Sequence, residues 1–492
     1  MTLPKFKKEH TKVILSFLAL FFLLCSYYII KPFRAGVFYK NFDYQTAPYL
    51  QLSCIIGSLL LTKVFTSFYK KLSSIKLVGA SYFIISLIHV SFYFLLTISS
   101  KKIAFIFCLW ASIYFLLALA ILWGNTNQIF SSKQAKIYYG FVLFGALSGS
   151  TCGSILSGYI IKLGYLDYSL LFSSALLLIS LIFIYFADHY NIDKITDSVS
   201  LDKQKKEEEK EKNQRGFFSD FQELFKKNYL LCIAIMVFCL TFSKTAFEYQ
   251  TLPIIDLEIS KQVFLIHFQD LNNKINKKQK LKQKFNLTAL EFIRSLKKLG
   301  EFQKLETIDL FKKTHNLSYD IQSSYKSYLK GFQTQISLWH NQTQNYQNIF
   351  ALVLLLFGSS FILQKLGVSI AISLLPVCFF ILLILTNFEI SLFAIQICKV
   401  VAGALDFSIN NASKELLFVS ANSEANLRFK PFIEGPIFRL GNACSAIAFI
   451  FLGKINGINS QAIFLSLALI IVSIWFLKAR DVAKQYNQLE GV

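Results

Sequence analysis

The sequence predicts an all-α membrane protein with twelve transmembrane helices in two six-helix bundles and a helical outer insertion between spans seven and eight. Its 492 residues are 54% hydrophobic and its mean hydropathy is +0.48, more than a soluble protein needs to fill a core. Apolar stretches of about 20 residues, the length of a membrane-crossing helix, recur along the chain. A polar, highly charged stretch separates six of them from six more.

Each predicted span is an apolar run bounded by charged or turn-forming residues. The first follows several lysines, so a secretory signal peptide is its alternative interpretation. No small-x-small cleavage site follows it, which favours a retained helix. In chain order the spans cover residues 12–31, 46–68, 75–98, 103–124, 139–161, 168–187, 229–252, 348–364, 368–388, 390–410, 432–453 and 461–477.

The spans divide the chain into two bundles and two polar segments. The polar segment at 188–228 contains the run KQKKEEEKEKNQR and is predicted to be a cytoplasmic linker, because it cannot bury enough apolar surface to order itself. The segment at 256–347 has apolar residues at helical spacing and is predicted to be an outer, helical insertion. The predicted units are residues 1–187, 188–228, 229–255, 256–347 and 348–492.

Cations in the short loops are concentrated on the side of the N-terminus, if every span crosses the membrane. The positive-inside rule then puts both termini in the cytoplasm. The composition, rich in Lys, Phe and Asn, favours a bacterial inner membrane. In a soluble protein the net charge of +22 would favour nucleic-acid binding, but here the cations lie in loops and in the insertion, so no nucleic-acid partner is predicted.

The two halves repeat one plan. Residues 123–158 (WGNTNQIFSSKQAKIYYGFVLFGALSGSTCGSILSG) form a polar hinge, a cationic loop and a helix rich in small residues, and residues 408–453 follow the same order. Matching halves in a membrane chain are typical of transporters. The Gly-rich face of 145–158 most often indicates close helix packing and only sometimes a moving interface.

Charged residues within the spans are the candidate functional residues, because each costs about 3 kcal/mol to insert and therefore tends to face a pathway. Lys31 and Arg34 end span one, although either side chain can snorkel to the headgroups. Lys244 and Glu248 lie one turn apart in span seven, where a structural ion pair is the alternative. Lys399 and Asp406 lie in span ten, and Lys399 is near mid-span, where snorkelling does not explain it.

Polar amides form a second group of candidates at the hinges. Asn127 in the first half and Asn410 and Asn411 in the second can hydrogen-bond a ligand, although satisfying backbone groups at a break in a helix is the safer interpretation. Several cations facing one cavity suit a polyanion. No Walker motif is present, so a nucleotide would be cargo and not fuel. No cofactor and no metal site are predicted.

Four stretches carry a resemblance to a known family: YYIIKPFRAGVF, WGNTNQIFSSKQAKIYYGFVLFGALSG, FEYQ, and SKELLFV followed by RFKPFIEGPIFRLGNACSA. They resemble the ATP/ADP translocases, the nucleotide transporters of plastids and obligate intracellular bacteria, with their bacterial relatives of major-facilitator type. The resemblance places Arg34 and Glu248 on the family's charged positions of helices one and seven. In the last stretch the matching residues are Lys414, Glu415, Lys430, Glu434, Arg439 and Gly441.

The chain also departs from that pattern. Cys108 stands where the exchangers have an acidic residue in helix four, Ala35 replaces the acid after the helix-one cation, and Asn442 replaces a lysine of plastid-type members. These differences weaken the case for strict ATP-for-ADP exchange and leave a transporter of that fold.

The sequence thus predicts a monomeric carrier, not an enzyme, that moves a nucleotide or similar phosphorylated anion through the bilayer by alternating access. The predicted substrate-binding residues are Lys31, Arg34, Asn127, Lys244, Glu248, Lys399, Asp406, Lys430 and Arg439. Two alternatives stay open: a carrier of another organic anion, such as a folate or thiamine-phosphate compound, and a non-transporting membrane scaffold that acts through the outer insertion.

Overall fold

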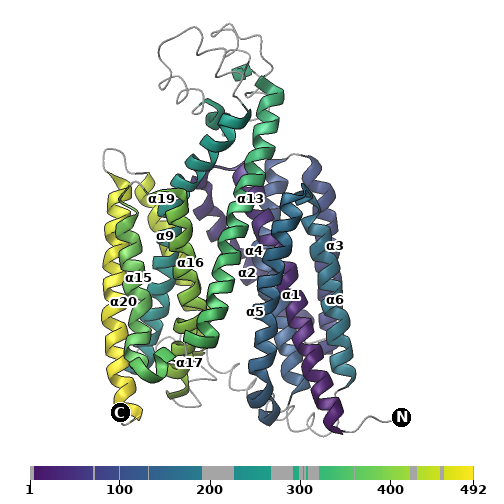
Figure 1. Ribbon diagram of the computed structural model, residues 1–492, viewed down its shortest axis with the longest axis vertical. Coiled ribbons are helices and arrows are strands. Elements are labelled where there is room, and N and C mark those ends of the chain that lie inside the picture. The colour runs from purple at the N-terminus through teal and green to yellow at the C-terminus, as the bar shows by residue number, and fades with distance from the viewer. Residues whose placement is uncertain are drawn as a thin grey trace.

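The computed structural model describes residues 5–69, 73–98, 100–130, 132–190, 226–267, 292–297, 303, 306–308, 321–358, 361–388, 390–420, 429–430, 432–454 and 459–490. Every regular element in this part of the chain is helical, as predicted. The helices stand side by side in two groups, and both termini lie at the same end of the molecule (Figure 1).

The N-terminal bundle is built around its first helix, which contacts α4, α5 and α6. The predicted apolar runs all become helices here, and α1, α4 and α5 continue beyond both predicted ends because polar residues extend the helix past the apolar stretch. The helices are α1 (Lys5–Asn41), α2 (Ala47–Tyr69), α3 (Ser74–Leu95), α4 (Lys101–Ile129), α5 (Ser132–Lys162) and α6 (Ser169–His189).

The C-terminal bundle contains helices of 10 to 40 residues, and several of them are interrupted by π-helical turns, which often mark functional sites. Its helices are α9 (Asn228–His267), α13 (Ile321–Val353), α15 (Gly367–Leu385), α16 (Leu392–Leu405), α17 (Asn411–Ser420), α19 (Phe438–Gly453) and α20 (Ser460–Glu490). The π-helical segments are η4 (Leu354–Gly358), η5 (Ile362–Leu366), η6 (Asp406–Asn410) and η7 (Ile433–Ile437).

Ten of the described helices are long and apolar enough to cross a membrane. Their outer faces carry large apolar side chains, for example Phe83 and Leu87 on α3 and Ile470 and Leu477 on α20. Such a surface suits lipid and not water. The chain is therefore an integral, multi-pass membrane protein.

Helices α9 and α13 differ from the predicted boundaries. Helix α9 continues to His267, beyond the predicted end of span seven at 252, and α13 begins at Ile321, whereas the prediction begins span eight at 348. Both extensions fall within 256–347, the range assigned to an outer insertion. Much of that range therefore belongs to helices that continue into the bundles.

The position of α13 explains this difference. It contacts α1 and α5 of the first bundle and α9 and α16 of the second, and Figure 1 shows it running obliquely between the two groups. It buries a row of apolar side chains, including Phe332, Ile336 and Trp339, together with polar ones such as Gln333 and Asn341. Because its polar groups face other helices and not lipid, its hydropathy is too low to be recognised as a span.

Several predictions lie outside the described residues. These are the linker at 191–225 and, within the insertion, residues 268–291, 298–302, 304–305 and 309–320.

The Gly-rich face of α5 packs closely against α1. A Cβ atom on Gly145 or on Gly153 would lie 2.6 Å from the carbonyl oxygen of Phe17 or of Cys25. Gly149 faces the carbonyl of Phe21 in the same way. Contacts this short leave no room for a side chain, so close packing, the first interpretation of this face, accounts for these three glycines.

Candidate functional site

The cations of helix α1 contact other residues of the N-terminal bundle. Arg34 Nη1 donates a 2.8 Å hydrogen bond to Ser112 Oγ on α4. Lys31 Nζ lies 5.1 Å from the centre of the Tyr28 ring, a cation–π distance. Both side chains are partly buried, so neither reaches freely into the headgroup region.

Helix α9 is the most enclosed candidate span, because 78% of its apolar window is buried. Lys244 and Glu248 are nevertheless exposed, and 46% of the Lys244 side chain is accessible. Both side chains are therefore accessible to solvent although the helix that carries them is otherwise enclosed.

Span ten supplies the partner of Lys244. Lys244 Nζ lies 2.7 Å from Asp406 Oδ2 at the start of η6, and Asn410 Nδ2 donates to Asp406 Oδ1 over 3.1 Å. The predicted neighbour Glu248 acts on Lys244 through its charge and is not the residue that binds it. Lys399, about two turns before Asp406, has Nζ 5.6 Å from the Trp339 ring of α13.

The charged groups of the two bundles lie close enough to influence one another. The charges of Arg34, Lys244, Glu248 and Lys399 all act on Lys31, and the charge of Glu248 acts on Lys399. Within the described part of the chain, Lys31, Lys399 and Glu248 form neither an ion pair nor a side-chain hydrogen bond. We call Lys31, Arg34, Lys244, Glu248, Lys399 and Asp406 the central charge group.

Four cations and two carboxylates make up this group, so positive charge is in excess. Unpaired ammonium groups inside a protein are unfavourable unless an anion or water neutralises them. Arg and Lys form charge-assisted hydrogen bonds with phosphate oxygens. The arrangement can therefore hold an anion that bridges α1 of one bundle and α9 and α16 of the other.

Three predicted site residues lie apart from the central charge group. Lys430 Nζ lies 2.6 Å from Glu415 of α17, at the end of the molecule that carries both termini (Figure 1). Arg439 is at the second position of α19, and Asn127 is exposed near the end of α4. In the same region Lys414 pairs with Glu434 at 2.7 Å, so four of the charged residues of the last stretch bind one another.

Helix α13 contributes residues that the sequence analysis missed. His340 is influenced by the charges of Lys399, Arg34 and Lys31, and its Nε2 forms no hydrogen bond to a described residue. Trp339 Nε1 and Gln344 Oε1 are likewise buried and without a partner in the described residues. The helical spacing of Tyr328, Phe332, Ile336 and Trp339 in 321–347 was the signal that could have identified a packed helix.

A second group of charges joins the bundles at the end away from the termini. Asp256 of α9 is 3% exposed and pairs with Arg294 Nη2 at 2.5 Å and with Lys297 Nζ at 3.7 Å. Lys297 Nζ also donates to the carbonyl oxygen of Tyr39 on α1 at 3.3 Å. Burial lowers the pKa of Lys297 to about 8, and the nearby Asp256 carboxylate opposes this shift.

Residues 292–297 therefore connect α9 to α1. Lys101 Nζ of α4 donates to the Lys297 carbonyl oxygen at 2.6 Å, and the Lys297 ammonium lies 3.6 Å from the centre of the Phe332 ring on α13. We call Asp256, Arg294 and Lys297 the end clamp. It holds the two bundles together at this end.

The described helices thus form two groups of membrane-spanning length, and charged residues of both groups, among them Arg34, Lys244 and Lys399, influence one another. The model of the TLC ATP/ADP transporter family matches residues 96–252 of this chain. The match confirms the resemblance inferred from the sequence, and it contains two of the four stretches that carried it, WGNTNQIF and FEYQ. The stretches around Arg34 and Arg439 lie outside it.

Solved structures of transporters share the fold. A mutant of the nucleoside transporter NupG aligns with a TM-score of 0.50 at 13% identity, covering 98% of this chain and 99% of that one. A bacterial homologue of the iron transporter ferroportin in an inward-facing state gives 0.53 at 11% identity, covering 98% and 99%. A bacterial homologue of the human lysosomal transporter Spinster, inward-facing and unoccupied, gives 0.52 at 10% identity, covering 97% and 98%.

A search among curated protein sequences found no match to this chain. At these low identities the structural likeness concerns the fold alone.

Proposed function

We propose that this protein carries a nucleotide or a related phosphorylated anion across the membrane by alternating access, as a twelve-helix carrier. Helices α2 and α13 would complete the ten candidate spans. The observation that supports the proposal best is the excess of cations, drawn from both bundles, in the central charge group. The family match adds support for nucleotide cargo.

In this proposal Arg34 and Lys399 neutralise phosphate charge from opposite bundles. Lys31 lies among the same charges and has no acidic partner among the described residues, so an incoming anion would relieve its repulsion from Arg34, Lys244 and Lys399. Trp339, His340 and Gln344 of α13 offer an aromatic surface and unpaired polar atoms beside the cations. Such groups suit the base and sugar of a nucleotide.

Lys244 is proposed to change partners during transport. It is bound to Asp406 and also feels the charge of Glu248, so it has two carboxylates within electrostatic reach. An anion bound in the central charge group would compete with Asp406 for the ammonium group. Release of the anion would restore the ion pair and reset the carrier.

Replacing Asp406 with Asn should lower both KM and kcat for transport. Lys244 would then bind the anion without competition, and release would slow. A change of about fivefold in each is expected, because an ion pair that water can reach contributes about 1 kcal/mol. Initial-rate uptake in liposomes measures this, with Asp481→Asn, which removes a surface partner of Lys478, as the control. An unchanged KM would refute the partner change.

The proposed function is tested by reconstituting the purified protein into liposomes with a panel of labelled anions. ATP, ADP and other nucleotides should be taken up, and unlabelled nucleotide should compete. Transport of a folate or of thiamine phosphate without nucleotide transport would replace the proposed cargo. The absence of transport for every anion would instead favour a scaffold.

A further inference from the structure

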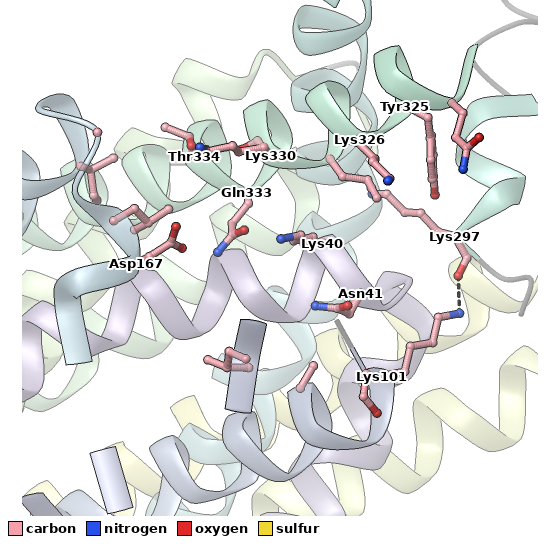
Figure 2. Close-up of a pocket in the computed structure, with 18 of the residues that line it drawn as sticks. Lys40, Asn41, Lys101, Asp167, Lys297, Tyr325, Lys326, Lys330, Gln333 and Thr334 are labelled. Carbon is pink, nitrogen blue, oxygen red and sulfur yellow. Dashed lines mark hydrogen bonds between the residues drawn. The ribbon is translucent and has the colours of Figure 1, made fainter. Parts of the chain in front are cut away.

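The described part of the chain also encloses a cavity of about 620 Å³ that is separate from the central charge group. It lies at the end away from the termini, where α1 and α5 end and where α4 and α13 begin. Figure 2 shows α13 forming one wall with Lys326 and Lys330, and Lys40 of α1 and Lys101 of α4 facing it. We call this space the lysine cavity.

The lining of the lysine cavity is strongly basic. Five lysines line it, Lys40, Lys101, Lys297, Lys326 and Lys330, and Asp167 is the single acidic residue among the described residues that do so. Two of the five are already engaged, because Lys297 belongs to the end clamp and Lys101 donates to the Lys297 carbonyl oxygen. The other three form no hydrogen bond or ion pair with the residues that the structure describes.

A neutral polar group lies on the same wall. Gln333 is 5% exposed, lines the cavity and is hydrogen-bonded to none of the described residues. Figure 2 shows its amide directed from α13 toward α1, next to Lys40. An amide that faces such a space can donate a hydrogen bond to a ligand or to water.

Membrane topology does not account for these cations. The positive-inside rule enriches Lys and Arg in short loops on the cytoplasmic side, which the sequence assigns to the end with the termini. The lysine cavity lies at the opposite end. Ammonium groups gathered around a small space also repel one another, and a bound anion removes that repulsion.

We propose that the lysine cavity binds a soluble, phosphate-bearing anion. Lys40, Lys326 and Lys330 supply the charge, and Gln333 supplies a hydrogen bond. Helix α13 begins at this cavity and continues to Trp339, whose ring lies beside Lys399. An anion bound in the cavity therefore lies at one end of the helix that contacts the central charge group. Only this link to transport rests on the proposed function; binding in the cavity does not.

The test measures the binding of inorganic pyrophosphate to the full-length protein in nanodiscs of phosphatidylcholine. The double variant Lys326→Gln/Lys330→Gln should bind about tenfold more weakly, since it loses two charge-assisted contacts at partly exposed positions. Lys102→Gln/Lys162→Gln is the matched control, because both are exposed lysines at the same end that do not line the cavity. Asp167→Asn should bind more tightly, because it removes the opposing carboxylate.

The outcomes separate this site from the central one and from lipid. Loss of pyrophosphate binding in Lys399→Gln but not in Lys326→Gln/Lys330→Gln would assign binding to the central charge group and overturn the proposal. Loss of pyrophosphate binding in discs that contain phosphatidylglycerol would show that lipid headgroups occupy the cavity. That result would also overturn the proposal. Pyrophosphate binding that depends on Lys326 and Lys330, in a protein that transports no nucleotide, would support the cavity and reject the proposed function.

Discussion

Replacing Lys399 with Gln is expected to lower nucleotide uptake by about 30-fold, while the protein should still insert and fold. Lys399 has no acidic partner among the described residues, so its removal leaves no unpaired carboxylate behind. The loss is the charge-assisted bond to phosphate, worth about 2 kcal/mol. Labelled ATP and ADP uptake into liposomes with matched amounts of protein measures the effect.

Two variants show whether the charge of Lys399 or its size matters. Lys399→Arg keeps the cation and should retain a substantial part of the uptake. Lys454→Gln removes an exposed lysine just after α19 and should leave uptake unchanged. Uptake by Lys399→Gln equal to that of the parent protein would remove Lys399 from the mechanism.

Replacing Asp256 with Asn opens the end clamp. The variant removes the carboxylate that binds Arg294 and Lys297, and breaking such a buried pair costs several kcal/mol. The pKa of Lys297 is already lowered to about 8, so without Asp256 the ammonium can lose its proton near neutral pH, which limits the loss to about 2 kcal/mol. Residues 292–297 should then detach more often from α1 and α13.

Hydrogen exchange of residues 292–297 reports this release, and a rise of about 30-fold in their exchange rate is expected if exchange follows local opening. Glu258→Gln is the control, since Glu258 lies on the same helix and, among the described residues, pairs with Lys261 three residues later at the surface. Exchange rates in Asp256→Asn that match those of Glu258→Gln would show that the clamp does not hold this segment.

The apolar spans were predictable because the bilayer demands about 20 consecutive apolar residues wherever a helix faces lipid. The predicted span 75–98 therefore ends within a few residues of the end of α3. The predicted span 432–453 likewise agrees with the combined length of η7 and α19. Helix α13 faces protein on most sides, so it does not need about 20 consecutive apolar residues. It carries Gln, Asn and Ser in its middle. A hydropathy rule could not find it, although its buried aromatic spacing was visible.

The candidate site was predictable in part for a related reason. Intramembrane charge is rare enough to identify Lys31, Arg34, Lys244, Glu248 and Lys399 from the sequence alone. Helical spacing predicted that Lys244 lies beside Glu248. The ion pair of Lys244 with Asp406 joins residues 162 positions apart in the sequence, so only the tertiary structure could reveal it. Lys430 matched a family pattern, yet its ammonium binds Glu415 near the termini.

We propose that side chains of both bundles line one chamber that holds the anion. Cysteines at Ser112, which binds Arg34 on the first bundle, and at Phe407, whose ring lies 5.5 Å from Lys244 Nζ on the second, test it directly. The partly exposed native cysteines, Cys54, Cys152, Cys378 and Cys444, are first replaced by Ser. The rate at which a charged thiol reagent modifies each introduced cysteine is then measured against ADP concentration. ADP is expected to protect both positions over the same concentration range. Protection of one position alone, or of neither, would contradict a chamber shared by the two bundles.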